Sequence, residues 1–139
     1  MVNFGKCNNF KRKKILFGKR IDINKWELIG GKIEPNEQPK EAIIREIKEE
    51  LDASVDYIKL STSYVVFLEE NEKINILHIT FIVTLNSEPK LNRECHSELK
   101  WIPLDELIMK LDDKNESKNF CFGTKKAIED SINEIKKIW

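Results

Sequence analysis

The sequence predicts one α/β domain in which a mixed β-sheet lies between helices. Three observations carry this prediction. Strand-like runs stand on both sides of one central helical stretch, a second helical stretch ends the chain, and 139 residues can bury a core without disulfide staples. We therefore expect a single domain that spans residues 1–139.

Short apolar runs before the central helix predict three strands: Val2–Cys7, Lys14–Arg20 and Trp26–Ile29. In the second run, Ile15 and Phe17 fall on one face and Leu16 falls on the other. The third run leads directly into two adjacent glycines. Glycine lets the backbone approach a ligand or metal ion closely, because no side chain stands in the way.

The central helix begins near Pro39, a residue that suits a first helical turn because its missing N–H would be unpaired there anyway. At 3.6 residues per turn, one arc of this helix is apolar: Ile43, Ile44, Ile47 and Leu51. The neighbouring arc carries three carboxylates: Glu46, Glu49 and Glu50.

Beyond this helix the pattern returns to strands, at Tyr57–Glu69, Lys73–Leu85 and Leu99–Ile102. The clearest alternation puts five residues on one face: Leu77, Ile79, Phe81, Val83 and Leu85. Two further helices are expected, one from Pro103 or Leu104 to Leu111 and one over Thr124–Trp139. The segments Asn86–Ser97 and Asp112–Lys118 are expected to be loops.

The three clustered carboxylates repel one another, at a cost of about 0.2 to 0.5 kcal/mol for each like-charged pair on an isolated helix. A solvated acidic face is one interpretation. The other is a Mg²⁺ site, because this cation prefers oxygen ligands and sits between carboxylates and substrate phosphates. The glycine loop directly before the helix favours the metal site.

Together, loop and helix resemble the Nudix box: Gly, five residues, Glu, seven residues, Arg-Glu, an aliphatic, any residue, Glu-Glu, any residue, Gly, an aliphatic. The matching positions are Gly31, Glu37, Arg45, Glu46, Ile47, Glu49, Glu50 and Ala53. Asp52 stands where the family usually has the helix-ending Gly, and Ile29 stands where it usually has Pro. So long a pattern is far more specific than a lone glycine motif.

The resemblance implies a Nudix-type fold, with the box helix lying across a mixed sheet, and a hydrolase of phosphoanhydride bonds. It also implies a Mg²⁺ cofactor, with Mn²⁺ as an alternative. The implied metal ligands are Glu46, Glu49, Glu50 and the Gly30 carbonyl. Such a cation neutralises phosphate charge and lowers the pKa of a bound water.

Residues expected to take part in catalysis are Glu46, Glu50, Arg45 and Glu98. Glu46 is our first choice for the general base and Glu98 the second, because the loop of Glu98 often reaches the site in relatives. Arg45 has Glu41 and Glu49 at four-residue spacing, which suits the orientation of a carboxylate. Glu37 is expected to pair with Arg45 or to support the metal shell.

Lys19, Arg20 and Gly31 are expected to bind substrate, because the strand that ends at Arg20 would lie close to the phosphates in this fold. KWELIGGKIEPNE resembles the MutT-type members, which convert nucleoside triphosphates to monophosphate and pyrophosphate. That reaction is our first hypothesis. The alternatives are hydrolysis of a nucleoside-diphosphate sugar of the GDP-mannose or ADP-ribose type, and a non-catalytic binding module with this fold.

Composition excludes some partners. Because 24 basic residues balance 24 acidic ones, we expect a small nucleotide substrate and no nucleic-acid duplex as partner. The three cysteines are widely spaced and are expected to be free thiols in a reducing compartment. No signal peptide or membrane span is visible, so we expect a cytoplasmic protein without membrane contact, as a monomer or homodimer.

Overall fold

A computed structural model describes residues 2–4, 13–67 and 75–138 of the chain. Its strands are β1 (Val2–Phe4), β2 (Lys14–Arg20), β3 (Trp26–Leu28), β4 (Val55–Phe67), β5 (Asn75–Leu85) and β6 (His96–Pro103). Its helices are α1 (Pro39–Leu51), α2 (Leu104–Asp112), the 3₁₀ helix η1 (Glu116–Asn119) and α3 (Thr124–Ile138). No helix in these ranges is long and apolar enough to cross a membrane.

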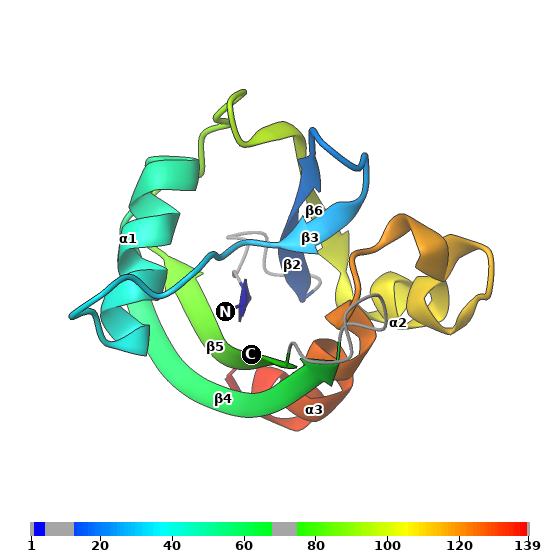
Figure 1. Cartoon of the computed structure of the whole chain (residues 1–139). Coiled ribbons are helices and arrows are strands. Elements are labelled where there is room, and N and C mark those ends of the chain that lie inside the picture. The colour runs from blue at the N-terminus through cyan, green and yellow to red at the C-terminus, as the bar shows by residue number, and fades with distance from the viewer. Residues whose placement is uncertain (1, 5–12, 68–74, 139) are drawn as a thin grey trace.

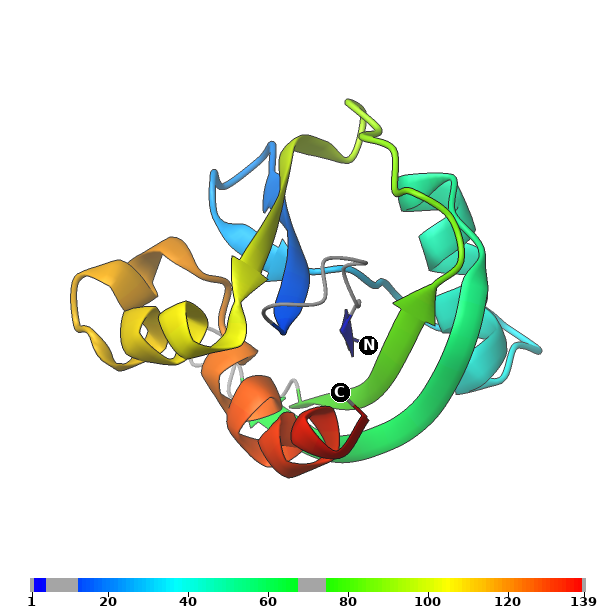
Figure 2. The same cartoon turned by 180° about the vertical axis from the view of Figure 1, so that it is seen from behind.

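The described strands form two three-stranded sheets, in the orders β1-β5-β4 and β3-β2-β6. In the first sheet β1 runs parallel to β5 while β4 is antiparallel to it, so this sheet is mixed, as the sequence predicts. In the second sheet both neighbours of β2 are antiparallel. Helix α1 lies on one side of the molecule, and α2 and α3 lie on the other (Figures 1 and 2). The predicted α/β architecture is confirmed.

Two apolar clusters hold these layers together. The cluster around α1, here called the α1 core, contains Leu16, Ile29, Ile43, Ile47, Leu51, Ala53, Phe81 and Val83. The cluster around α2 and α3, here called the α3 core, contains Ile15, Phe17, Leu28, Tyr64, Ile82, Ile102, Leu104, Leu107, Leu111, Phe120, Ala127, Ile128 and Ile135. Strand β2 contributes side chains to both clusters, because its side chains alternate between its two faces.

Helix α1 has well-defined ends. At its start, Gln38 has an extended backbone and its N–H donates to the Glu41 carboxylate, 3.3 Å away. At its end, Asp52 adopts the left-handed conformation with φ 46°. Glycine takes this conformation most freely. Asp52 therefore ends the helix in the backbone conformation expected of the glycine that the family usually has at this position.

Several boundaries differ from the sequence prediction. Strand β6 begins at His96 rather than Leu99, because His96 and Glu98 also pair with β2. The expected loop Asp112–Lys118 is wrong in part, because η1 begins within it. Leu77 is 59% exposed although it shares the inward face of β5, since this end of the strand extends beyond the α1 core. The expected ends at Cys7, Glu69, Lys73 and Trp139 lie outside the described residues.

Candidate active site

The glycine loop lies directly against the acidic face of α1. A Cβ atom built on Gly31 would contact the Glu46 carboxylate, with the carboxyl carbon 2.5 Å away. Real Cβ atoms do not approach other atoms so closely, so only glycine fits here without a shift. The structure thus gives a reason for the second glycine, which is the close approach of a catalytic candidate.

Arg45 ties this loop to the helix. Its Nε and Nη2 atoms donate to the two oxygens of Glu37, at 2.7 and 2.9 Å, and Nη2 also donates to the carbonyl of Lys32. Its Nη1 atom donates to Glu46 at 2.9 Å and to Glu49 at 3.2 Å. The expected pair of Arg45 with Glu37 is therefore present, and so is the contact with Glu49.

Glu41 is not among the ion-pair partners of Arg45 in the described chain, although the spacing suggests it. Its carboxylate caps the start of α1 instead. The bidentate contact with Arg45 lowers the pKa of Glu37 to about 2, so Glu37 stays ionised at neutral pH. The same contact raises the pKa of Arg45, which holds its positive charge in place between the loop and the helix.

Glu50 is partly buried, and its environment favours the protonated form. Burial raises its pKa to about 8, and the charges of Glu46, Glu27 and Glu49 add to the rise, while a hydrogen bond from the backbone N–H of Gly30 opposes it. Its Oε2 atom is buried and has no hydrogen-bond partner among the described residues. Such an atom costs free energy unless a ligand satisfies it.

As they stand, no three His, Cys, Asp or Glu side chains in the described chain are arranged to hold a metal ion. Arg45 engages Glu46 and Glu49 in this conformation. The donor set nevertheless fits a divalent cation, because it consists of hard oxygen atoms and includes the unpartnered Oε2 of Glu50. A bound cation would also remove the mutual repulsion that raises the pKa of Glu50.

A pocket of about 760 Å³ opens beside the glycine loop. Its wall includes Gly30, Gly31 and Arg20, and it runs to the far ends of β4 and β5, at Tyr64 and His78. Arg20 is held by two hydrogen bonds to Asp22, at 2.9 and 2.5 Å. The structure thus brings Arg20 and Gly31 to one cavity, as a shared role in substrate binding requires.

Two candidate residues lie elsewhere. Lys19 pairs in register with Trp26 and with Glu98, so the three side chains share one face of the second sheet. The Nζ atom of Lys19 lies 5.5 Å from the centre of the Trp26 ring. Glu98 is exposed on that face, whereas Glu27 and the glutamates of α1 lie on the other side. The structure does not bring Lys19 or Glu98 to the acidic face.

Sequence reasoning did not single out two residues close to the site. Glu27 lines the pocket and its charge acts on Glu50. His96 is 1% exposed and contacts Glu27, with 2.9 Å between Nε2 and Oε1. The alternation within Trp26–Leu28 places Glu27 opposite the core-facing neighbours, but only strand pairing shows that His96 reaches it.

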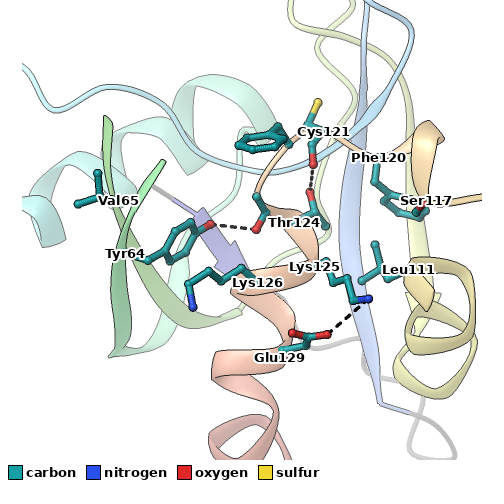
Figure 3. A pocket seen from close by; sticks show the side chains of 12 residues that line it. Tyr64, Val65, Leu111, Ser117, Phe120, Cys121, Thr124, Lys125, Lys126 and Glu129 are labelled. Carbon is teal, nitrogen blue, oxygen red and sulfur yellow. Dashed lines mark hydrogen bonds and ion pairs between the residues drawn. The ribbon is translucent and has the colours of Figure 1, made fainter. Parts of the chain in front are cut away.

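A second pocket, of about 650 Å³, shares the segment Cys121–Thr124 and Tyr64 with the first (Figure 3). The Tyr64 hydroxyl donates to the carbonyl of Gly123, and Thr124 Oγ1 donates to the carbonyl of Cys121. These bonds fix the wall between the two pockets. The glutamates of the acidic face line neither of these two pockets, but Gly30 and Gly31, which lie against that face, line the first and not the second.

Comparison with known proteins agrees with this geometry. A NUDIX domain profile matches residues 6–121. A MutT NUDIX hydrolase from Burkholderia pseudomallei is 22% identical over 92% of this chain and 94% of its own, with a TM-score of 0.70. A NUDIX hydrolase from Nitrosomonas europaea is 21% identical over 96% and 86%, with a TM-score of 0.75. The NUDIX domain of Shewanella oneidensis NrtR, in complex with ADP ribose, is 16% identical over 96% and 84%, with a TM-score of 0.72.

The chain is a small α/β domain with a glycine loop against an acidic helix, and the NUDIX domain profile matches most of its length. The chain belongs to the NUDIX family and is a hydrolase that acts on phosphoanhydride bonds. Hydrolases of this family generally use a divalent metal ion.

Proposed function

We propose that this chain is a Mg²⁺-dependent nucleoside triphosphate pyrophosphohydrolase of the MutT type, which releases nucleoside monophosphate and pyrophosphate. One observation carries the proposal. The glycine loop, which lies against the acidic face of α1, and the Arg20 side chain border a single pocket large enough for a nucleotide. A cation and a base for the attacking water would stand on one side of the phosphates, and Arg20 on another.

In this proposal Glu46, Glu49, Glu50 and the Gly30 carbonyl hold the metal. The bound cation would supply a Lewis acid for the phosphate oxygens and a water of lowered pKa. Arg45 would turn the carboxylates of Glu46 and Glu49 toward their working positions, since it already contacts both. Glu37 would hold Arg45 through its bidentate contact.

Glu46 remains our choice for the general base. Its carboxylate lies against Gly31, at the edge of the pocket where a substrate phosphate would approach. Glu98, the second choice, points from the other face of its sheet. The geometry therefore favours Glu46 as the group that takes a proton from the attacking water.

The runner-up is hydrolysis of a nucleoside-diphosphate sugar of the GDP-mannose or ADP-ribose type. The pocket favours it in one respect, because its wall continues past the glycine loop to Tyr64, His78 and Cys121–Thr124. That length leaves room for a group beyond one nucleoside. A neighbour of the same fold holds ADP ribose.

Product analysis distinguishes the two reactions. The protein is incubated with Mg²⁺, in ¹⁸O-labelled water, with nucleoside triphosphates, dinucleoside polyphosphates and nucleotide sugars, and the products are followed by phosphorus NMR. We expect pyrophosphate and monophosphate from a triphosphate. Faster turnover of a nucleotide sugar to two monophosphates would favour the runner-up, and no turnover by folded protein would favour a binding module.

Two glutamine variants make this test specific to the site. Glu50→Gln should lower activity by at least a hundredfold, because it removes a metal ligand, with little loss of thermal stability, because it relieves the repulsion by the neighbouring carboxylates. Glu98→Gln is the matched control, an exposed glutamate of the same type, and should keep near wild-type activity. An active Glu50→Gln protein would contradict the metal assignment, and an inactive Glu98→Gln protein would restore Glu98 as the base. The cytoplasmic location and the monomer or homodimer stay predictions.

A further inference from the structure

The pair of Glu27 on β3, which is partly exposed, and His96 on β6, which is buried, has no part in the proposed chemistry so far. The Nε2 atom of His96 lies 2.9 Å from Oε1 of Glu27, across the central strand β2. A carboxylate oxygen accepts hydrogen bonds, so we assign the proton of this bond to Nε2 of His96, which then donates to Glu27. His96 is 1% exposed and Glu27 is 25% exposed, so the imidazole end of this bond is shielded from water.

The central strand β2 has a glycine, Gly18, where the imidazole ring of His96 packs against it. A Cβ built on Gly18 would lie 2.5 Å from Cδ2 of His96 and 2.6 Å from Nε2. Gly18 stands directly opposite Glu27 on one side and Leu99 on the other. A glycine inside a central strand weakens the strand and often marks a place where another group approaches closely. Here that group is the imidazole of His96.

A bulge in β6 turns His96 toward Glu27. Lys19 pairs with Glu98, but the next residue, Arg20, pairs with His96, so Ser97 is an extra residue on β6. Without the bulge, Ser97 would stand opposite Arg20 and share the face of Glu27. His96 would then point to the opposite face. Bulges of this kind often aim a side chain beside an active site.

The pair also leaves a polar atom unsatisfied. Nδ1 of His96 is buried and finds no hydrogen-bond partner within the described part of the chain. A buried nitrogen without a partner destabilises the fold, whereas an apolar side chain would fill this place without that cost. Gly18, the bulge and the unpaired Nδ1 each reduce the stability of the fold, and all three accompany the contact of His96 with Glu27. Fold stability does not explain them.

The contact leaves the second oxygen of Glu27 for the pocket. Oε2 lies 3.7 Å from Nε of Arg20, and both residues line the cavity beside the glycine loop. A carboxylate repels phosphate but accepts hydrogen bonds, so a neutral hydrogen-bond donor of the substrate suits Glu27. In a nucleotide whose phosphates lie at the acidic face of α1, the next group along the molecule is the sugar, and its donors are hydroxyls.

We propose that His96 is a positioning residue that holds the Glu27 carboxylate so that Oε2 accepts a hydrogen bond from a sugar hydroxyl of the substrate. This inference rests on the proposed function, because it takes a nucleotide as the ligand. It adds a preference for substrates that carry that hydroxyl. Glu27 touches the substrate, and His96 acts only through Glu27.

The test compares a nucleoside triphosphate with its 2′,3′-dideoxy analogue, which lacks both hydroxyls. The wild-type protein should prefer the hydroxyl-bearing substrate roughly tenfold or more in kcat/KM, the usual range for a hydrogen bond to a charged acceptor. Glu27→Ala should bring this ratio close to one. His96→Ala should lower it severalfold, mainly through KM, and His96→Gln, whose amide can donate in place of Nε2, should restore most of it.

Two further variants separate positioning from general damage. Gly18→Ala should reproduce His96→Ala, because its Cβ would displace the ring. Ile135→Val removes one methyl group from the α3 core, so it should lower the melting temperature without changing the ratio. Equal losses on both substrates in His96→Ala, or a wild-type protein that does not distinguish them, would overturn the inference.

Failure of the proposed function gives a different result. In that case the wild-type protein hydrolyses neither nucleotide, and the same ratio is measured as binding affinity by calorimetry with Mg²⁺ and the same two nucleotides. Tighter binding of the hydroxyl-bearing nucleotide, lost in Glu27→Ala and His96→Ala, would support the inference without catalysis. Equal binding of the two nucleotides would contradict it.

Discussion

At the scale of single residues, the site combines the Arg45 guanidinium, which is held in place, with the Glu50 carboxyl, whose ionised form is disfavoured. Arg45 contacts Glu37, Glu46 and Glu49 at once, so its position is determined by several bonds. At Glu50, a hydrogen bond from the N–H of Gly30 favours the ionised carboxylate, whereas burial and three acidic neighbours disfavour it. Its carboxyl is therefore the group that responds most strongly to pH and to a metal ion.

Without a metal ion, the free energy of unfolding should fall as the pH rises from about 4.5 to about 8. The folded pKa of Glu50 is raised, so the folded state binds the extra proton; its stability is fully present below 4.5 and is lost as pH approaches 8. The loss should be on the order of a few kcal/mol. Thermal or urea denaturation in EDTA at several pH values measures it.

The Glu50→Gln variant should not show this pH dependence, since its amide does not titrate, and should exceed the wild type in stability at pH about 9 without metal. Adding Mg²⁺ should stabilise the wild type at that pH and leave the variant unchanged. Glu98→Gln serves as the control and should follow the wild-type curve. A wild-type stability that stays level across the range would show that Glu50 is ionised in the folded protein.

At the scale of elements, helix α1 is held at both ends by polar residues. Glu41 caps its first turn, and Asp52 ends it in the left-handed region. The Asp52 carboxylate also pairs with Lys48 at 2.7 Å and with Lys90 at 3.4 Å. Both pairs are exposed, and exposed pairs contribute little to stability. The backbone conformation should therefore decide the effect of a substitution here.

Asp52→Gly should raise the melting temperature by a few degrees, because glycine adopts the left-handed conformation at no steric cost. Asp52→Ala should lower it by a similar amount, since alanine keeps the strain and loses the ion pairs. Differential scanning calorimetry at neutral pH measures both. Lys90→Ala removes one ion pair alone and should change little. A less stable glycine variant would mean that the ion pairs outweigh the backbone.

At the scale of the whole molecule, β2 joins the two cores. Leu16 packs into the α1 core, while Ile15 and Phe17 pack into the α3 core, where Phe17 meets the edge of Phe120 at 5.4 Å between ring centres. The site lies where these layers meet, since the glycine loop follows β3 and the acidic face belongs to α1. Damage to β2 should therefore reach both cores and the site.

Leu16→Ala should reduce the free energy of unfolding by about 2 to 5 kcal/mol, the usual cost of a cavity at a buried leucine. The unfolding transition should stay single, because one strand serves both cores. Leu60→Ala is the matched control, since Leu60 is 59% exposed and should lose little. Chemical denaturation followed by fluorescence gives both values. Two separate transitions in Leu16→Ala would show that the cores unfold independently.

Local patterns predicted much of this molecule. The alternation in Lys14–Arg20 predicts a strand buried on both faces, and the period of the apolar residues after Pro39 predicts the buried side of α1. These features depend on neighbours in sequence, so a sequence pattern contains them. The spacing of Glu37 and Arg45 likewise predicts a contact within one loop and one helix, and the structure has it.

Contacts between distant segments were decided by the tertiary structure. The partnership of Glu27 with His96 depends on the register of β2 with two strands and on one bulge, neither of which leaves a periodic signal. The same register turns Lys19 and Glu98 away from the acidic face. The sequence by itself determined which groups could do the chemistry, because local spacing sets one helix face. Only the folded chain decided which of them share a pocket, because strand pairing joins residues far apart in sequence.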